Sequence, residues 1–135
     1  MCLSKITRIP EHIENCAYGT KKRYGYKVYI KYESDCDERY DNIFMRGNPI
    51  KIGETISSSG FVNFSPVYPG GFHVFDKLDD AIRYKEGFNN GMCVVCKVKC
   101  HYITCEGLQK ICQIDGYCAT CFCCLNIEIV EEIAV

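Results

Sequence analysis

The chain has 135 residues, with 16 Lys and Arg against 17 Asp and Glu, and it contains 12 cysteines. This length suits one domain with a single core, and the net charge of −1 gives no positive field that would attract nucleic acid. No apolar run approaches the roughly 18 residues of a membrane span, and the N-terminus lacks the apolar core of a signal peptide. We therefore expect a cytoplasmic protein without nucleic-acid or membrane partners.

Residues 1–25 are the least regular part of the sequence, and we expect them to form an N-terminal arm packed on a single domain of residues 26–135. Residues 26–32 alternate apolar or aromatic side chains with lysines, which is the period of a half-buried strand. A polar turn and a returning strand over residues 42–45 are expected to complete a hairpin. Residues 50–56 predict a short edge strand.

The clearest turn, strand and helix lie together in the middle of the chain. Proline and two glycines over residues 69–71 end any regular element, and residues 72–75 then read as a strand. Asp76 is placed to cap a helix over about 77–86, since its carboxylate can accept a hydrogen bond from a first-turn amide. Gly87 is expected to end this helix in the left-handed conformation.

The last third of the chain predicts three further strands, over residues 92–100, 111–114 and 117–129. Asp115-Gly116 is a pair favoured in tight hairpin turns. The last strand is expected to bend or bulge near Cys123. We therefore predict an α+β domain with a mainly antiparallel sheet and one principal helix.

Nine of the 12 cysteines lie in this last third, and without a secretion signal the reducing cytoplasm favours free thiols or metal ligands over disulfides. Cys93 and Cys96, taken with Cys118 and Cys121, have a spacing close to that of a four-thiolate zinc site. Residues three apart in a strand point to opposite faces, however, so Cys93 and Cys96 share one ion only if the chain curls. We therefore favour buried free thiols and no cofactor, with zinc as the alternative.

Three residues are candidates for catalysis. Cys2 becomes an N-terminal nucleophile with its own α-amine base if the initiator methionine is removed, although an ordinary cysteine is the simpler interpretation. His73 lies between Phe72 and Val74 in a predicted strand, so it faces solvent or a cleft if these neighbours are core residues. Glu128 is predicted to point away from its two isoleucine neighbours in the last strand.

Arg46 precedes Gly47 at the end of a predicted strand. A guanidinium in that position can bind a carboxylate or a phosphate through two parallel hydrogen bonds, although an exposed arginine is the more common explanation. Together with His73, Arg46 defines a candidate cleft for a small molecule or a host protein.

Five segments of the chain carry a resemblance to known sequences. They are Met1-Cys2-Leu3, Gly25-Tyr26-Lys27-Val28, Ile43-Phe44-Met45-Arg46-Gly47 with Ile52-Gly53, Gly71-Phe72-His73-Val74-Phe75 with Asp80-Ala81, and Ile127-Glu128-Ile129-Val130-Glu131-Glu132-Ile133. Together they resemble a family of small uncharacterised phage, bacterial and giant-virus proteins, and the resemblance covers most of the chain. It implies a single domain and a viral context, in which the cytoplasm would be that of the host.

Residues 71–75, followed by Ala81 and Tyr84, are also similar to a stretch of the ADP-ribosyltransferase fold in which a strand with an aromatic residue precedes a helix. The His-Gly of the first strand and the Ser-Thr-Ser motif of those enzymes are missing here. This second resemblance therefore implies an ADP-ribosyltransferase-like fold that is kept for binding a nucleotide-like ligand, with the transferase chemistry lost.

The same resemblance implies roles for individual residues. Arg46 would hold NAD, His73 would replace the aromatic residue that stacks on nicotinamide, and Glu128 would orient the ribose. Phe72 and Tyr84 become further candidate ligand contacts.

Three functions stand as alternatives at this point. The preferred hypothesis is a small viral-type cytosolic domain that binds a nucleotide-related small molecule or a host factor in a cleft near His73 and Arg46. The second is a non-enzymatic protein-interaction module, stabilised by zinc through its cysteines. The third is an NAD-dependent enzyme of the ADP-ribosyltransferase type.

Overall fold

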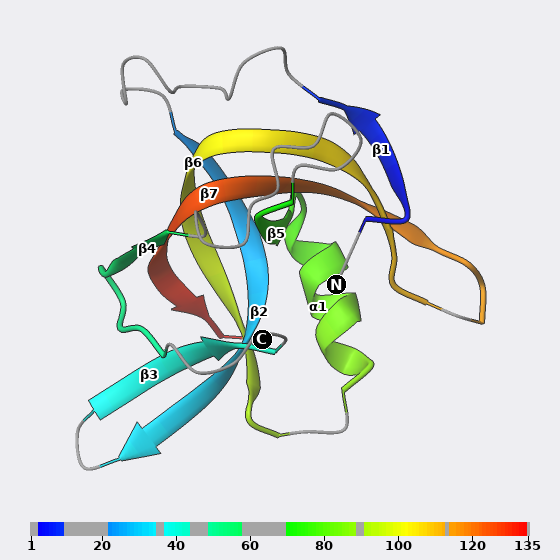
Figure 1. Cartoon of the computed structure of the whole chain (residues 1–135). Helices are drawn as coiled ribbons and strands as arrows, with labels where there is room; N and C mark the ends of the chain where they lie inside the picture. The colour runs from blue at the N-terminus through cyan, green and yellow to red at the C-terminus, as the bar shows by residue number, and fades with distance from the viewer. Residues whose placement is uncertain are drawn as a thin grey trace.

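The computed structural model describes residues 3–9, 22–34, 37–43, 49–57, 70–88, 91–112 and 114–134, and Figure 1 shows how their elements are arranged. One short helix packs against a sheet in which every paired strand is antiparallel to its neighbour. The elements in chain order are β1 Lys5–Arg8, β2 Arg23–Ser34, β3 Asp37–Asn42, β4 Thr55–Ser57, β5 Phe72–Phe75, α1 Leu78–Glu86, β6 Cys93–Lys110 and β7 Cys118–Ile133. The prediction of a mainly antiparallel sheet with one principal helix is confirmed.

Four of the strands pair in a closed ring. β6 pairs with both β2 and β7, while β5 pairs with β7 and, through one residue pair, with β2. β1, β3 and β4 extend the sheet from β6, β2 and β7 respectively. In Figure 1 the two longest strands, β6 and β7, curve side by side across the upper part of the molecule. This curvature lets β5 on one side and β2 on the other meet, so the sheet closes on itself.

The two faces of the sheet carry two separate hydrophobic clusters. The ring cluster draws on all four strands of the ring, and its buried members are Tyr29, Tyr40, Ile50, Phe72, Val74, Cys96, Val98, Cys100, Ile103, Phe122, Cys124, Ile127 and Ile129. The helix-side cluster includes residues of α1, and its buried members are Leu3, Val28, Ile30, Phe75, Ala81, Cys93, Val95, Cys105, Ala119, Cys121 and Cys123. Because successive residues of a strand point to opposite faces, a strand that feeds both clusters is buried on both sides.

The helix has the predicted extent, but it is capped differently from the prediction at both ends. Lys77 is the N-cap residue, with an extended backbone and no side-chain cap bond, whereas the carboxylate of Asp76 lies 3.3 Å from the guanidinium of Arg23. The prediction that Asp76 caps the helix is therefore wrong, because a strand residue occupies its carboxylate. Gly87 has a φ of −74°, so it ends the helix in the right-handed and not the left-handed region. None of the described residues forms a helix long and apolar enough to cross a membrane.

Several strands differ in extent from the prediction. β3 begins inside the stretch predicted as a polar turn, because its residues pair with the second half of β2. β6 continues to Lys110 instead of ending near residue 100, and residues 111, 112 and 114 lie outside any strand. β1 lies within the predicted N-terminal arm but pairs with β6. These segments are polar and have weak alternation, so their strand conformation depends on tertiary pairing.

Candidate functional site

His73 lies in the middle of β5 and is the Cα partner of Cys123 on β7. Its neighbours Phe72 and Val74 are buried in the ring cluster, and His73 itself is half-buried with its side chain on the opposite face. Burial, together with the nearby positive charge of Lys27, lowers the pKa of His73 to about 3. The imidazole is therefore neutral at physiological pH, and its pKa lies too low for a general base that works near neutrality.

Lys27 on β2 reaches across to β5. Its Nζ donates a hydrogen bond to the backbone carbonyl of His73 at 3.0 Å and lies 5.7 Å from the centre of the Tyr29 ring. Its Cα partner on β6 is Cys96, a ring-cluster residue, so the lysine stem points to the same face. Burial lowers the pKa of the Lys27 ammonium. Lys27 as a whole residue is nevertheless only half-buried.

β2 and β5 meet at a junction that we call the seam. Tyr26 is paired with Phe75, and this is the single residue pair between the two strands. Gly25 allows this approach, because a Cβ at residue 25 would lie 2.4 Å from Cγ1 of Val74 and 2.8 Å from the carbonyl oxygen of Phe75. Past Tyr26 no further residue pair joins β2 to β5 among the described residues, and the Lys27 ammonium donates to the backbone carbonyl of His73.

The electrostatic surroundings of Lys27 differ from those of the next lysine on its face of the strand, Lys31. The Nζ of Lys31 lies 2.9 Å from Glu132 and 3.0 Å from Glu33, and hydrogen bonds to these two carboxylates raise its pKa. Among the described residues, the recorded contacts of Lys27 are with a carbonyl and an aromatic ring, and no carboxylate lies within 4.0 Å. Buried charges in proteins are normally paired, so the site of Lys27 fits a neutral amine or an anion supplied by a ligand.

Two of the predicted site residues, Cys2 and Arg46, lie outside the described residues. Phe72 is buried in the ring cluster, and its backbone pairs with β7. Tyr84 packs its ring between Phe75, with centroids 5.2 Å apart, and Phe88, with centroids 5.0 Å apart. Burial raises the pKa of Tyr84 to about 12. Tyr84 therefore joins α1 to the sheet on the helix side.

The structure does not bring Glu128 to His73. Glu128 pairs with Lys99 on β6 and Thr55 on β4, and its carboxylate lies 3.4 Å from the Lys99 ammonium. Along β7 it is five residues from Cys123, the partner of His73, which corresponds to about 16 Å of extended strand. As predicted, it points away from the isoleucines on either side, which are both buried in the ring cluster. This arrangement does not support the acid and aromatic pair that the ADP-ribosyltransferase likeness implies.

The four cysteines with zinc-like spacing are distributed over different surroundings. Cys96 belongs to the ring cluster, Cys93 and Cys121 belong to the helix-side cluster, and Cys118 is exposed. Burial raises the pKa of both Cys96 and Cys121 to about 12, so these two thiols are protonated. In the part of the chain that the structure describes, no group of three or more His, Cys, Asp or Glu residues is placed to hold a metal ion.

Lys27 is the site residue that the sequence prediction missed. The alternation over residues 26–32 assigns it to a solvent face, but both faces of β2 are covered in the folded protein. One signal was present in the sequence. Gly25 interrupts an otherwise strong strand pattern, and a glycine inside a strand often marks the close approach of another backbone.

No protein-family model, no curated protein and no solved structure matches the chain. The resemblance to small phage, bacterial and giant-virus proteins therefore stays a prediction, and the ADP-ribosyltransferase likeness finds no support.

Proposed function

We propose that the protein is a small viral-type cytosolic domain that binds a nucleotide-related small molecule at the seam, with Lys27 as the partner of an anionic group on the ligand. The observation that carries this proposal is the position of Lys27, a half-buried lysine with no carboxylate within 4.0 Å among the described residues. A lysine ammonium is a compact point charge with three donors, and phosphate is one of the groups it commonly binds.

His73 takes part in this proposal through its backbone carbonyl, which accepts the hydrogen bond from Lys27, since its imidazole lies on the opposite face of the sheet. The imidazole itself is uncharged and has a hydrogen bond with the backbone of Gly71. Its low pKa of about 3 keeps it in this form across the physiological range. Arg46, outside the described residues, stays a predicted second cation of the site.

Anion binding at Lys27 also has an electrostatic consequence. The free site disfavours the charged amine, because burial lowers the pKa of Lys27. A bound phosphate favours the charged form, so the complex takes up a proton at pH values where the free amine is neutral. The affinity is therefore expected to fall as the pH rises.

The test compares ADP, inorganic pyrophosphate and uncharged adenosine by isothermal titration calorimetry with the wild type, Lys27→Met and Lys31→Met. We expect ADP to bind the wild type and Lys31→Met with similar affinity, and to bind Lys27→Met at least about tenfold more weakly, or about 1.4 kcal/mol. Adenosine, which has no phosphate group, should bind the wild type at least about tenfold more weakly than ADP does. Equal ADP affinity for the wild type and Lys27→Met, or no binding of either phosphate compound to the wild type, would contradict the proposal.

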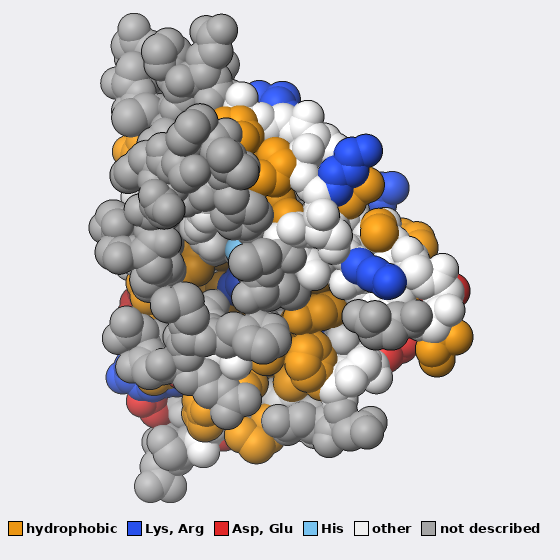
Figure 2. Space-filling view, turned by 45° about the vertical axis from the view of Figure 1, so that its right-hand side comes forward, with side chains coloured by type: hydrophobic (Ala, Val, Ile, Leu, Met, Phe, Trp, Pro, Cys, Tyr) orange, Lys and Arg blue, Asp and Glu red, His pale blue; other side chains and the backbone are white. Residues whose placement is uncertain are grey.

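A protein-interaction role is a second candidate, supported by large apolar side chains at the surface. Ile114, at the turn between β6 and β7, is 99% exposed. Tyr32 and Met92 are 40% and 45% exposed and lie near each other, since the backbone amide of Lys31 donates to the carbonyl of Met92. Figure 2 shows hydrophobic side chains reaching the surface of one face, with Lys and Arg side chains beside them. A pull-down that compares the wild type with an Ile114→Ser control tests whether a host protein binds this turn.

A further inference from the structure

Cys105 on β6 and Cys123 on β7 are Cα partners in the antiparallel ladder, and neither forms a disulfide. Such partners have Cα atoms about 4.5–5.5 Å apart, which falls inside the range of roughly 4.4–6.8 Å found in disulfides. Their side chains point to one face, both lie in the helix-side cluster, and the two thiols are hydrogen bonded to each other. The backbone therefore already has the spacing that a bond between the two sulfurs needs.

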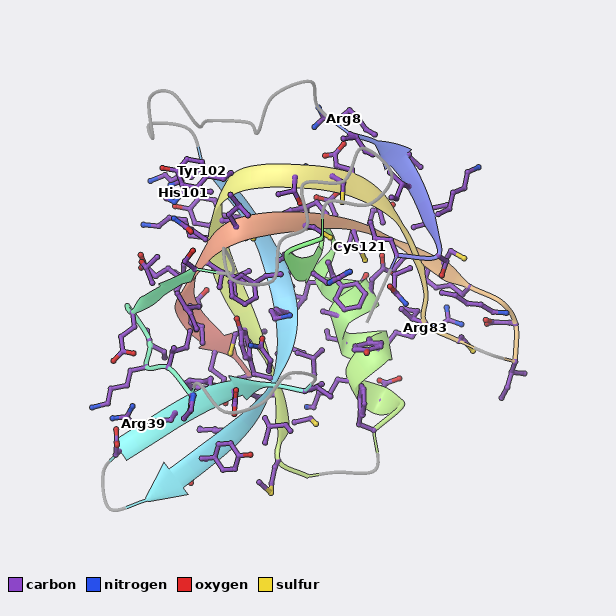
Figure 3. The ribbon with its side chains drawn as sticks, in the orientation of Figure 1. Arg8, Arg39, Arg83, His101, Tyr102 and Cys121 are labelled. Carbon is purple, nitrogen blue, oxygen red and sulfur yellow. The ribbon has the colours of Figure 1, made fainter. Side chains whose placement is uncertain are left out.

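The ladder is irregular immediately beside this pair. The register of β6 against β7 shifts between Ile103 and Cys105, which makes Thr104 the extra residue of a bulge. Tyr102, labelled in Figure 3 at the bend of β6, has a φ of 62°, an uncommon value for a residue other than glycine. Both thiols are fully buried, so a reagent must reach them by local opening, and an interrupted ladder is where such opening needs least energy.

The surroundings of Cys105 also favour its reactive form. A hydrogen bond with Cys123 lowers the pKa of Cys105 to about 7. Burial opposes this shift, while hydrogen bonds with Thr104 and with the backbone of Gly70 add to it. Burial instead raises the pKa of Cys121, in the same cluster, to about 12. Since the thiolate is the nucleophile in thiol chemistry, Cys105 is the attacking residue of this cluster.

We propose that Cys105 and Cys123 form a reversible disulfide by exchange with a small-molecule disulfide. The Cys105 thiolate attacks one sulfur of the reagent, forms a mixed disulfide and displaces one small thiolate, which takes a proton from water. Cys123 then loses its proton to solvent and attacks the Cys105 sulfur, which closes the protein disulfide and displaces the second small thiolate. The protein gives up two electrons and two protons, and the reagent becomes two thiols.

A second hydrogen-bonded pair of thiols provides an internal comparison. Cys100 and Cys124 contact each other in the ring cluster, but their Cα partners are Ile127 and Ile103, so they are not opposite each other in the ladder. Burial and the neighbouring Cys100 thiol raise the pKa of Cys124 far above its ordinary value. This pair is therefore expected to stay reduced while Cys105 and Cys123 react.

The test treats the folded full-length protein with oxidised glutathione, blocks free thiols with N-ethylmaleimide and measures the intact mass without reduction. Relative to protein denatured and blocked without oxidised glutathione, we expect the wild type to take up two fewer N-ethylmaleimide groups at Cys105 and Cys123, to carry no glutathione on either residue, and to recover both thiols when dithiothreitol precedes the blocking step. Cys123→Ala should retain one glutathionyl group on Cys105, because the second thiol is missing. Cys105→Ala should show neither change. Cys124→Ala should behave as the wild type, which separates Cys123 from its neighbour.

Several results would overturn the proposal. They are a wild type that stays fully reduced, a disulfide that persists in Cys105→Ala or Cys123→Ala, and a disulfide that is lost in a folded Cys124→Ala. Circular dichroism checks that each variant is folded. If the alanine variants do not fold, non-reducing peptide mapping of the oxidised wild type decides alone, because cleavage after Phe122 separates Cys121 from Cys123. Because the peptide that begins at residue 123 also contains Cys124, fragmentation must locate the linked residue: a link from Cys105 to Cys123 supports the proposal, and any other link contradicts it.

Discussion

Tyr26 on β2 and Phe75 on β5 are Cα partners, and this pair closes the ring formed by β2, β6, β7 and β5. On one side of the pair, Gly25 lies so close to β5 that a side chain there would overlap Val74. On the other side, the ladder ends and the ammonium of Lys27 reaches the His73 carbonyl. The proposed ligand site thus lies beside the narrowest closure of the sheet, and the closure and the site can be tested separately.

Gly25→Ala should lower the free energy of unfolding by about 1–3 kcal/mol, because the added Cβ would lie 2.4 Å from Val74 and force the two strands apart. Urea denaturation measures the change. Gly91→Ala is the matched control, since a Cβ at residue 91 meets nothing within 4 Å, and its effect should stay within about 0.5 kcal/mol. Equal effects of the two substitutions would mean that the closure is not tight.

Lys27→Met and Lys31→Met should affect the stability of the protein differently at pH 7. Lys31 loses the carboxylates of Glu132 and Glu33, so its replacement should destabilise the protein. Lys27 has no such partner among the described residues, and replacing a poorly compensated buried amine by an apolar group should be neutral or stabilising by about 1 kcal/mol.

The difference in stability between the wild type and Lys27→Met should depend on pH, and this dependence checks the prediction. The folded pKa of Lys27 lies below its unfolded value of 10.5, so the unfolded chain binds more protons between these two values and wild-type stability rises with pH there. The advantage of Lys27→Met should therefore shrink as the pH approaches 10.5. Urea denaturation midpoints measure this advantage across the pH range. An advantage of Lys27→Met that is the same at every pH would argue against a buried amine at residue 27.

His73 should make the protein less stable in acid. Burial and the charge of Lys27 hold its folded pKa at about 3, below the unfolded value of 6.5, so the unfolded state binds more protons between these two values. The contribution of His73 to stability is present above pH 6.5 and is lost as the pH falls, with a slope of at most about 1.4 kcal/mol per pH unit. His73→Gln should flatten this part of the stability curve. An NMR titration that finds the His73 imidazole half-protonated near pH 6.5 would contradict the assignment.

Glu132 should contribute a second, smaller acid dependence. Burial opposes its ionisation, but hydrogen bonds from Lys31 and Tyr40 outweigh burial and lower its pKa below 4.5. Because the folded pKa is the lower one, the stabilisation is present above about pH 4.5 and is lost as the pH falls through the folded value. Glu132→Gln should cost about 0.5–1 kcal/mol at pH 7 and nothing in strong acid. A cost that persists at low pH would assign the effect to packing instead.

The middle of the chain shows which structural features local sequence patterns predict. Residues 72–75 form the predicted strand without any change of boundary, because a proline and two glycines precede them and a helix follows. The helix was also predictable from its apolar spacing and acidic first turn. Its cap was not, since the competing partner of Asp76 is Arg23, which lies 53 residues earlier in the chain.

The cysteines show the same division. Successive residues of a strand alternate between its two faces, so Cys93 and Cys96, three residues apart, are predicted to lie on different faces. The structure places them in different clusters. No spacing predicts that Cys105 lies opposite Cys123, because that pairing depends on the turn between β6 and β7 and on the bulge at Thr104. The reactive pair therefore could not be chosen from nine closely spaced cysteines.

The sequence by itself determined the local features of the domain: a mainly antiparallel sheet, one helix after a short strand, and cysteines that behave as small core residues. These features depend on neighbours within a few residues, where periodicity and turn chemistry act directly. The tertiary structure alone decided that the sheet closes between Tyr26 and Phe75, that both faces of β2 are covered, and that Lys27 reaches the backbone carbonyl of His73. The surroundings of a side chain are set by strands distant in sequence, and so are its pKa and its candidate function.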